Sequence, residues 1–312
     1  MPGFDPSYGY TLEQLLRIAP PPQPWDFESF WRSRYERAMQ LEPQPRLTPG
    51  NGSHPDYDCY DLAYRSTGDF EIGGWALIPK RGPVTRGVVV GHGYGGRDGP
   101  DYHLPIAGAA FLFPCFRGLS RSRRWPISDN PHYHVLHNIH KKDRYILGGC
   151  VEDLWLAVSA LLRLFPAVAG HVAYLGISFG GGIGALALPW DLRIRRAHFN
   201  VPTFGHHPLR LQLPSTGSVA AVQVYQREHG HILDILSYYD AAVAAQYIRI
   251  PVHVAAALAD PAVAPPGQFS IYNGLPGEKR LFVLDKGHLD YPRRVEQENA
   301  LLAELHHFFS EL

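Results

Sequence analysis

Short apolar runs alternate with helical patterns along most of the chain after residue 85. Strands that are apolar along their whole length are typical of a parallel sheet with helices on both faces. The 312 residues, 45% of them hydrophobic, suffice for one large core or two modest domains. We therefore predict an α/β fold with a mostly parallel central sheet. The expected strands are residues 86–93, 109–116, 171–178, 195–202, 249–260 and 279–288, and the expected helices are residues 151–165, 179–188, 267–273 and 293–309.

The N-terminal part of the chain has a different pattern. Residues 1–24 are rich in Pro, Gly and Tyr and predict an extended arm. Residues 25–41 carry large apolar side chains near helical spacing, which predicts an amphipathic helical extension of the sheet domain. Residues 57–66 and 69–78 alternate between two faces around a turn signal and indicate a hairpin. We expect the helix, the hairpin and the sheet to form a single domain over residues 25–312.

Charge and cysteine content limit the partners and the location of the chain. The 29 basic and 29 acidic side chains cancel, so no global field attracts nucleic acid or anionic lipid. Three cysteines without regular spacing, Cys59, Cys115 and Cys150, argue against a disulfide framework and indicate buried free thiols. No secretory signal opens the sequence, and no apolar run reaches the roughly 18–20 residues of a membrane span. We therefore expect a cytoplasmic protein without nucleic-acid or membrane partners.

The segment Gly176-Ile177-Ser178-Phe179-Gly180 has G-x-S-x-G spacing and lies between a predicted strand and a predicted helix. In that setting a sharp turn exposes the serine hydroxyl, and glycines fit the crowded backbone around it. The N–H of Phe179 would lie at a helix N-terminus, where it can stabilise a developing oxyanion. The alternative is a tight glycine-rich turn with an incidental serine. The flanking strand and helix favour Ser178 as a nucleophile.

A second glycine-rich turn, His92-Gly93-Tyr94-Gly95-Gly96, follows an earlier predicted strand. Turns of this kind supply the other N–H that faces an oxyanion, here that of Tyr94. Their glycines let the backbone approach a substrate closely. The alternative is a plain loop at the exit of the strand, and Ser178 further along the chain argues against it.

An acid and a histidine follow Ser178 in the chain order that such a site requires. Asp260 and His288 each stand at the end of a predicted strand. Because the carboxyl ends of parallel strands meet at one edge of a sheet, we expect these side chains to lie together. His288 would take the proton of Ser178, a weak nucleophile on its own, and Asp260 would orient His288. The rival acids are Asp240, Asp285 and Asp290, of which the last two are close to His288 in sequence.

A polar stretch over residues 121–148 fits no strand and predicts a long functional loop or partial cap. The spacing His132-x-His134 in it could seed a metal site. Neither Cys ligands nor H-E-x-x-H spacing lie nearby, and the 17 histidines are spread along the chain. We therefore expect surface or pocket-lining histidines and no metal site.

Four side chains are predicted to contact the substrate. Arg117 follows an apolar run and could bind an anionic substrate, or it could form a salt bridge to Glu152 or Asp153. The predicted substrate-binding residues are Tyr94, Arg117, Trp125 and Phe204.

Taken together, these motifs resemble the acetyl xylan esterase and cephalosporin C deacetylase family of α/β hydrolases. The likeness runs from about residue 25 to the C-terminus. Its most specific part is the last third of the chain, where the acid is followed by a Pro-Pro pair and a Phe-x-x-Tyr-Asn stretch. The matching segments are WDFESFWRSRYERA at 25–38, HGYGG at 92–96, Arg117-Gly118, GISFGGG at 176–182, Asp260-Pro261, PPGQFSIYN at 265–273 and Gly287-His288.

The resemblance implies an α/β-hydrolase fold and hydrolysis of acetyl esters on sugars. It implies Ser178, Asp260 and His288 as catalytic triad, with the N–H groups of Tyr94 and Phe179 as oxyanion donors. Family members need no cofactor and are often hexameric, so we expect no cofactor, a small-molecule ester as substrate, and a homo-oligomer as an open possibility. A general short-chain carboxylesterase and a non-catalytic binding protein are the alternatives. The chain departs from the family at Leu119, Phe179 and Leu289, where the family has Gln, Gln and Glu.

Overall fold

The computed structural model describes residues 3–312, and these residues contain a nine-stranded sheet. The strand order is β1-β2-β3-β5-β4-β6-β7-β8-β9. The strands are β1 (Arg46–Ser53), β2 (Tyr57–Ser66), β3 (Phe70–Pro79), β4 (Arg86–Gly91), β5 (Ala109–Pro114), β6 (Val172–Ile177), β7 (Ile194–Asn200), β8 (Val252–Ala257) and β9 (Lys279–Leu284).

Strands β4 to β9 are parallel to one another, and β1, β2 and β3 form an antiparallel meander that joins the sheet through β5. The predicted parallel strands and the predicted hairpin are therefore confirmed. Strand β1 was not predicted, because its sequence RLTPGNGS has little apolar alternation and contains a proline and two glycines. Within residues 3–312 it pairs with β2 alone, and its register shifts after Pro49, as is typical of an edge strand.

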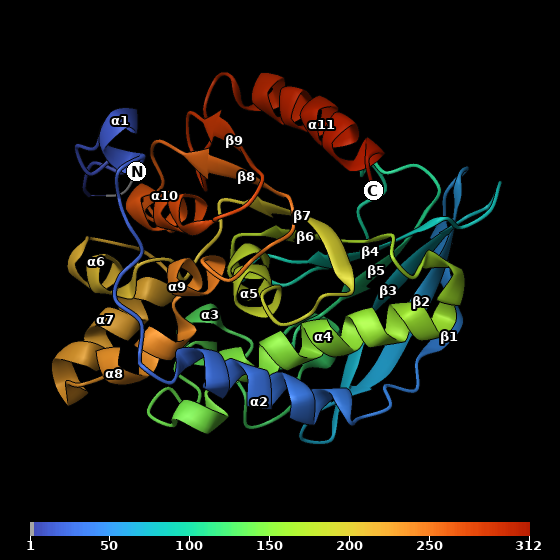
Figure 1. Ribbon diagram of the computed structural model, residues 1–312, viewed down its shortest axis with the longest axis horizontal. Coiled ribbons are helices and arrows are strands. Elements are labelled where there is room, and N and C mark those ends of the chain that lie inside the picture. Colours follow the sequence, from blue (N-terminus) through green and yellow to red (C-terminus); the bar gives the residue numbers. More distant parts are fainter. Residues whose placement is uncertain (1–2) are drawn as a thin grey trace.

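Helices cover both faces of the sheet (Figure 1). The N-terminal helix α2 (Phe27–Met39) lies outside α4 (Ile146–Leu164), which packs on the same face as α5 (Phe179–Ala187). Helix α11 (Arg294–Ser310) covers the opposite face. The α/β-hydrolase fold with an N-terminal helix is thereby confirmed. The other helices are α1 (Leu12–Leu15), α3 (Pro131–His134), α6 (His207–Gln212), α7 (Ser218–His229), α8 (Leu233–Leu236), α9 (Ala241–Ala245) and α10 (Pro265–Gly274).

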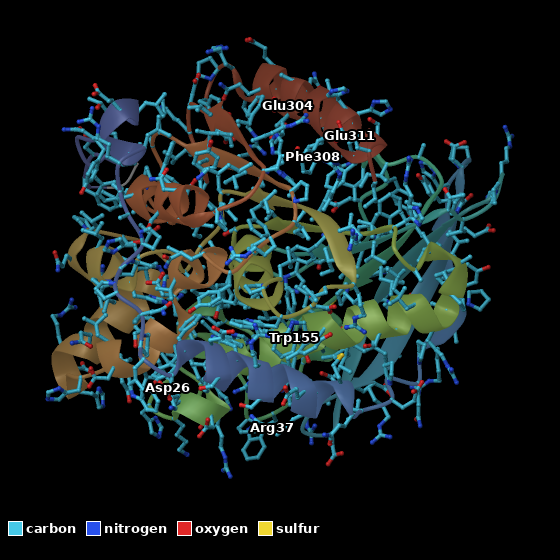
Figure 2. All side chains as sticks on the ribbon, in the orientation of Figure 1. Asp26, Arg37, Trp155, Glu304, Phe308 and Glu311 are labelled. Carbon is cyan, nitrogen blue, oxygen red and sulfur yellow. The ribbon has the colours of Figure 1, made fainter. Side chains whose placement is uncertain are left out.

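Each face of the sheet has its own apolar core. On the α4 side, Trp155 is fully buried, packs edge-on against Trp31 of α2 at 6.2 Å between ring centroids, and donates its indole N–H to the carbonyl of Ala187 (2.9 Å). On the α11 side, Phe308 is fully buried, and it lies between Glu304 and Glu311 along the helix (Figure 2). The carboxylates of Glu304 and Glu311 pair with a histidine and an arginine of the sheet, so polar contacts flank this second core.

Helix α4 begins five residues earlier than the sequence pattern predicts. Its first turn contains Gly148 and Gly149, and glycines are unfavourable inside helices, so the sequence predicts a later start. In the structure Arg117 lies directly over this turn, and a Cβ at Gly149 would stand only 2.5 Å from Nη1 of Arg117. Gly149 is therefore explained by the packing of Arg117 against the helix, and Gly148 by that of Arg34, whose guanidinium carbon lies 2.6 Å from the place of a Cβ there.

Between β7 and β8 the chain forms α6, α7, α8 and α9, which the sequence did not predict. Three of these helices have four to six residues, too few for a helical period to appear. The longer α7 buries only Val219 and Val222, so its pattern is weak as well. Helices α6, α7 and α8 lie beyond the edge of the sheet where the parallel strands end (Figure 1).

The N-terminal segment lies beside α10 (Figure 1). Within the predicted arm, Leu12–Leu15 form the short helix α1, and Asn273 of α10 donates to the carbonyls of Leu15 and Ile18 (2.9 Å each). Residues 1 and 2 of the arm lie outside the described residues. The division into an arm over 1–24 and one domain over 25–312, with a loop or partial cap at 121–148, stays a prediction.

Two further expectations concern cysteines and membranes. Cys59, Cys115 and Cys150 are all buried and free, as predicted. Over residues 3–312, none of the helices combines the length and the apolar character that crossing a bilayer requires.

Candidate active site

Ser178 occupies a strained turn between β6 and α5. Its backbone has φ 51° and ψ −108°, outside the regions that non-glycine residues usually adopt. Glycines permit this turn, since a Cβ at Gly176 would lie 2.6 Å from the backbone of Gly180, and one at Gly180 would lie 2.6 Å from that of Gly91. The Ser178 N–H donates to the carbonyl of Asn200 (2.8 Å), which ties the turn to the end of β7.

Three side chains from the ends of three strands form one hydrogen-bonded chain. His288 Nε2 is 3.0 Å from Ser178 Oγ, and His288 Nδ1 is 2.7 Å from Oδ2 of Asp260. Because a carboxylate only accepts, Nδ1 carries the ring proton and Nε2 is free to accept the proton of Ser178. The structure thus brings together the three residues predicted to form the triad.

Asp260 is fully buried and well supplied with donors. Its Oδ1 accepts from the N–H groups of Ala262 and Val263 (2.9 Å each), and its Oδ2 accepts from Nε2 of Gln268 (3.1 Å). Its own N–H donates to the carbonyl of Pro6 in the N-terminal segment (2.9 Å). These contacts fix the carboxylate beside His288. No sequence signal pointed to the contact of Gln268 with Asp260, although Gln268 lies in the family-like segment 265–273.

The proximity of Asp260 changes the protonation of His288. Burial of the ring lowers the pKa of His288, but the hydrogen bond to Asp260 and the negative charge of that carboxylate together raise it above its ordinary value. The imidazolium form of His288 is accordingly stabilised by Asp260.

The rival acids are engaged elsewhere. Asp240 accepts N–H groups of His206 and His207 and caps α9, and burial raises its pKa to about 6 against the opposing effect of those N–H groups. Asp285 accepts from Gln297, and Asp290 pairs with Arg294. None of these three acids is hydrogen-bonded to His288 within residues 3–312.

The turn after β4 holds the N–H of Tyr94 in a fixed direction. His92 is buried and accepts the N–H of Phe116 at Nε2 (3.0 Å), so its proton is on Nδ1 and donates to the carbonyl of Gly93 (2.7 Å). The N–H of Gly96 donates to the same carbonyl (3.0 Å). In a planar trans peptide the N–H of Tyr94 points away from that carbonyl.

The N–H groups of Tyr94 and Phe179 are the two that were predicted to face an oxyanion. Neither donates to an acceptor within the described part of the chain, residues 3–312. The two turns are bonded to each other, because the N–H of Gly180 donates to the carbonyl of His92 (2.9 Å). The rings of Tyr94 and Phe179 also pack together at 4.2 Å.

The hydroxyl of Tyr94 is bound to a fully buried histidine. His134 Nε2 is 2.9 Å from the carbonyl of Arg117, which only accepts, so Nε2 carries the proton. His134 Nδ1 therefore accepts from the hydroxyl of Tyr94 (3.0 Å). Burial lowers the pKa of His134 to about 4, so the ring is neutral at pH 7. Sequence reasoning missed this contact, because His134 lies among other histidines in a polar stretch.

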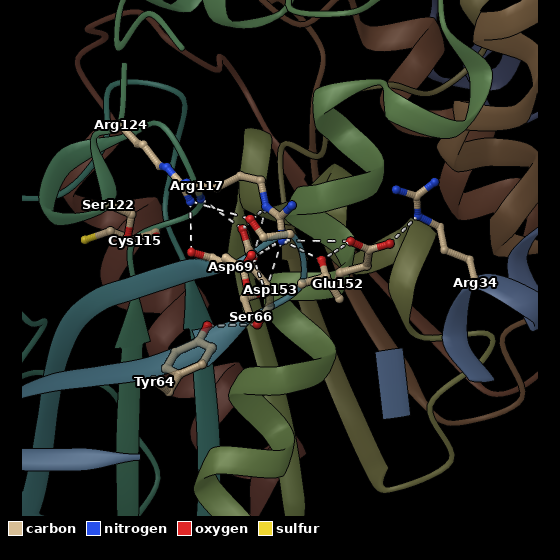
Figure 3. Close-up of polar contacts among 12 residues, drawn as sticks. Arg34, Tyr64, Ser66, Asp69, Cys115, Arg117, Ser122, Arg124, Glu152 and Asp153 are labelled. Carbon is tan, nitrogen blue, oxygen red and sulfur yellow. Dashed lines mark hydrogen bonds and ion pairs between the residues drawn. The ribbon is translucent and has the colours of Figure 1, made fainter. Parts of the chain in front are cut away.

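Arg117 is bound by an acidic network rather than exposed to a substrate (Figure 3). Its Nε and Nη2 reach both oxygens of the buried Asp153 (3.0 and 2.6 Å), and Nη2 lies 3.8 Å from Glu152. Glu152 in turn pairs with Arg34 of α2 (2.8 Å). The alternative of a salt bridge is therefore confirmed. With its guanidinium engaged in this way, Arg117 is left out of the substrate site that we propose below.

The other predicted substrate-binding residues occupy different surroundings. Phe204 is buried and packs against Phe179, with ring centroids 5.8 Å apart. Trp125 is 91% exposed on the loop over 121–148 and takes no part in this aromatic cluster. His132 is exposed and His134 is bound as described, and within residues 3–312 no three His, Cys, Asp or Glu side chains are grouped as metal ligands.

Known proteins resemble this chain in sequence and in fold. The sequence model of the family described as Acetyl xylan esterase (AXE1) matches residues 9–305. The chain belongs to the acetyl xylan esterase family. Among solved structures, acetyl xylan esterase 1 from Thermoanaerobacterium sp. JW/SL YS485 is similar, with a TM-score of 0.83 at 20% identity over 97% of this chain and 99% of that one.

Two other solved structures extend the comparison. The acetyl xylan esterase from Paenibacillus sp. R4 has a TM-score of 0.83 at 23% identity over 95% of this chain and 99% of its own. The Pyrococcus horikoshii acylaminoacyl peptidase has a TM-score of 0.64 at 15% identity over 82% of this chain but only 42% of its own. At these identities the likeness concerns the fold.

Proposed function

We propose that this chain is a serine esterase that removes small acyl groups, acetyl above all, from the hydroxyl groups of sugars or related alcohols. The observation that carries the proposal is the hydrogen-bonded chain from Ser178 through His288 to the buried Asp260. The N–H groups of Tyr94 and Phe179, which bind no acceptor within residues 3–312, are the oxyanion donors that we propose for it. Membership of the acetyl xylan esterase family supports the acetyl group, and the two similar acetyl xylan esterases suggest a sugar as the alcohol.

In the first step Ser178 Oγ attacks the ester carbonyl carbon while its proton passes to Nε2 of His288. The carbonyl oxygen becomes an oxyanion that the N–H groups of Tyr94 and Phe179 stabilise, a contribution of about 10²–10³ in rate for one such donor. The bond to the alcohol then breaks, and the imidazolium of His288 gives its proton to the departing alkoxide. The products of this step are the free alcohol and an acyl group on Ser178.

In the second step water replaces the alcohol. His288 takes a proton from the water as its oxygen attacks the acyl carbon, and the same two N–H groups hold the second oxyanion. The bond to Ser178 breaks, and His288 returns the proton to Oγ. The carboxylic acid leaves, and Asp260 stabilises the transient imidazolium in both steps.

A crowded aromatic cluster beside Ser178 supports a small acyl group. The ring of Phe179 lies 4.2 Å from that of Tyr94 and 5.8 Å from that of Phe204. If the acyl pocket is closed, an added methylene costs about 1–3 kcal/mol of overpacking, whereas in an open groove it would gain about 0.8 kcal/mol. We therefore propose that acetyl and propionyl esters are preferred to octanoyl and longer ones.

The first experiment compares purified wild-type protein with Ser178→Ala in fluorophosphonate labelling and in hydrolysis of 4-nitrophenyl acetate. We expect labelling of the wild type only, and a loss of kcat of at least ~10³-fold in the folded variant. Near-normal turnover by Ser178→Ala would exclude Ser178 as nucleophile. A wild-type protein that neither reacts with the probe nor hydrolyses esters would favour the non-catalytic alternative.

The second experiment measures kcat/KM for 4-nitrophenyl esters of two to twelve carbons and for acetylated sugars. We expect the values to fall beyond three carbons and acetylated sugars to be deacetylated. A profile that climbs steadily past six carbons would favour a general carboxylesterase instead.

A further inference from the structure

The connection between β4 and β5 leaves part of one sheet face open. Two parallel strands are usually joined through a helix, but the described residues 92–108 contain none. A cavity of about 650 Å³ lies there, between this connection, the ends of β4, β6 and β7, and helix α11. Sites for small molecules have volumes of about 300–1,000 Å³, so the cavity has room for a ligand.

This cavity adjoins a second one of about 350 Å³ that His288 lines. The residues common to both walls are Ile177, Asn200, Glu298 and Leu301. We call the two cavities together the α11 groove. Gly93 lines the larger cavity, and a Cβ at Gly93 would lie 4.0 Å from Cβ of Ser178, so the groove passes beside the proposed nucleophile.

The proposed mechanism assigns this groove to the alcohol part of the ester. His288 gives its proton to the departing alkoxide, so the alcohol must lie against His288. On the other side of the nucleophile, the rings of Tyr94, Phe179 and Phe204 crowd the space that we propose for the acyl group. The α11 groove begins at His288 and gives the alcohol the room that the acyl side lacks.

A chain of three polar side chains ends at the α11 groove in a bare ring nitrogen. Nε2 of the buried His253 is 3.1 Å from Oε1 of Glu304, which only accepts, so Nε2 carries the proton. Nδ1 of His253 then accepts from Nδ1 of His198 (3.1 Å). Burial lowers the pKa of both rings below the ordinary value, so both are neutral at pH 7. Nε2 of His198 is therefore an acceptor, and it has no partner within residues 3–312.

A second polar side chain without a partner lies beside His198. The carboxamide of Asn200 forms no hydrogen bond within residues 3–312, and its Oδ1 is buried, so Nδ2 is its outward end. His198 and Asn200 are two residues apart on β7, which places them on the same face, roughly 7 Å apart. Both line the larger cavity. One acceptor and one donor at this spacing match the hydroxyl groups of a polyol, since a hydroxyl both donates and accepts.

The rest of the wall fits a neutral ligand with an apolar face. Apolar side chains of the sheet and of α11 line the larger cavity, among them Val90, Leu175, Leu302 and Leu305. Within the described chain, three carboxylates and one arginine line the same cavity, so an anion is disfavoured. A sugar ring combines C–H faces with neutral hydroxyl groups, and it suits both parts of this wall.

We infer that the alcohol part of the substrate extends from His288 into the α11 groove, where the side chains of His198 and Asn200 bind its hydroxyl groups. The substrates are then esters of alcohols longer than one sugar ring, such as acetylated oligosaccharides. The inference rests on the proposed function and names the size and chemistry of the alcohol.

The test compares two acetyl esters, monoacetylated methyl β-xyloside and monoacetylated xylotriose. Because both release a secondary sugar hydroxyl, the ratio of their kcat/KM values reports the binding of the additional rings. We expect wild-type kcat/KM to be at least 10-fold higher for the xylotriose ester. Leu302→Trp narrows the larger cavity, and we expect the ratio to fall at least 10-fold in this variant. The matched control is Val295→Trp on the same helix, 67% exposed and outside both walls, in which the ratio should equal that of the wild type.

Two further variants test the polar contacts. Asn200→Leu and His198→Phe remove one hydrogen-bonding group each with little change in volume. We expect the ratio to fall about 5-fold in either, the effect of one hydrogen bond, through a higher KM for the xylotriose ester. If Asn200 had only a structural role, the ratio would be that of the wild type, and removal of its buried Oδ1 would raise the melting temperature.

A wild type that hydrolyses both esters equally well would overturn the inference. So would an unchanged preference for the xylotriose ester in Leu302→Trp and Asn200→Leu. If Leu302→Trp does not fold, the wild type and Asn200→Leu decide the question. If the wild type hydrolyses no ester, the proposed function fails. Calorimetric titration with xylotriose then tests the groove by itself: binding that weakens in Asn200→Leu supports the inference, and no binding to the wild type overturns it.

Discussion

The buried His134 holds the half-buried Tyr94 through a single hydrogen bond to its hydroxyl. The hydroxyl of Tyr94 is used in that bond, so its side chain is not a proton donor toward the site. The contribution of Tyr94 to the proposed reaction is its backbone N–H, and His134 acts on it only through the position of the ring. His134 is thus a positioning residue in the proposed mechanism.

Removing the hydrogen bond between Tyr94 and His134, by substitution of either residue, should lower kcat while KM changes little. For Tyr94→Phe and for His134→Leu we expect about a 10-fold fall in kcat, the equivalent of one net hydrogen bond. Steady-state kinetics with 4-nitrophenyl acetate measure the effect, and His132→Leu, an exposed neighbour, is the control. A change in melting temperature without any change in kcat would show that His134 has only a structural role.

Asp260 should be the acid on which turnover depends. In Asp260→Asn the amide favours the wrong tautomer of His288, and we expect kcat to fall by about 10⁴-fold. The raised pKa of His288 also predicts that wild-type kcat/KM declines as the pH falls through a value above 6.5, since only neutral His288 accepts a proton. With Asp260 replaced, the midpoint of that decline should move to lower pH.

The rival acids provide the comparison for this prediction. Asp285→Asn and Asp290→Asn should stay within a few-fold of wild-type kcat, because both side chains are bound on the surface near α11. If Asp240→Asn or Asp290→Asn lowers kcat far more than Asp260→Asn does, the assignment of Asp260 as the acid is wrong.

Positions at strand ends were predictable from the sequence, and buried polar contacts were not. Ser178, Asp260 and His288 each follow an apolar strand, and parallel strands bring their ends to one edge. The contacts of His134 depend instead on the path of a polar segment, which has no periodicity to reveal which side chains turn inward. The salt bridge of Arg117 was foreseen only as one of two alternatives, since a buried arginine has the same sequence signature in either role.

At the scale of elements, the N-terminal segment is joined to the loop that carries Asp260. The carbonyl of Pro6 accepts the N–H of Asp260 (2.9 Å), and the hydroxyl of Tyr8 donates to the carbonyl of Pro214 (2.8 Å). These contacts make residues 3–10 a support for the proposed catalytic acid. The sequence predicted an extended arm there but could not place it, since its Pro and Gly content leaves its direction open.

Deleting residues 1–10 should therefore reduce activity more than stability. We expect kcat to fall by about 10-fold, as one hydrogen bond that orients Asp260 is lost, and the melting temperature to fall by only a few degrees. Activity assays and thermal unfolding of the truncated chain measure both. Truncation of Glu311 and Leu312 at the other end is a control for shortening the chain, although it removes the ion pair of Glu311 with Arg196. Unchanged kcat after the N-terminal deletion would contradict the supporting role.

For the whole molecule, the buried histidines predict sensitivity to acid. Burial lowers the pKa of His92 and His134 to about 4 and that of His207 to about 3, so all three are neutral in the folded state at pH 6. In the unfolded chain they titrate near 6.5. Below that pH the unfolded state binds more protons, and each histidine lowers the free energy of unfolding by roughly 1.4 kcal/mol per pH unit.

Urea unfolding at pH 7 and pH 5 measures this loss. We expect stability at pH 5 to be lower by several kcal/mol, and the difference to be smaller in His134→Phe, which cannot take up the proton. Equal stability of the wild type at the two pH values would show that these histidines are not held neutral in the fold.

The bond between Pro6 and Asp260 also bears on how the protein is made. Pro6 leaves the ribosome well before its partner, which is synthesised about 250 residues later, after nearly the entire sheet. During translation the N-terminal segment therefore has no place to dock until β8 and the loop after it have emerged. His288, in the turn after β9, emerges later still. Esterase activity should appear only once His288 has emerged, and a nascent chain stalled before residue 260 should remain unable to turn over an ester.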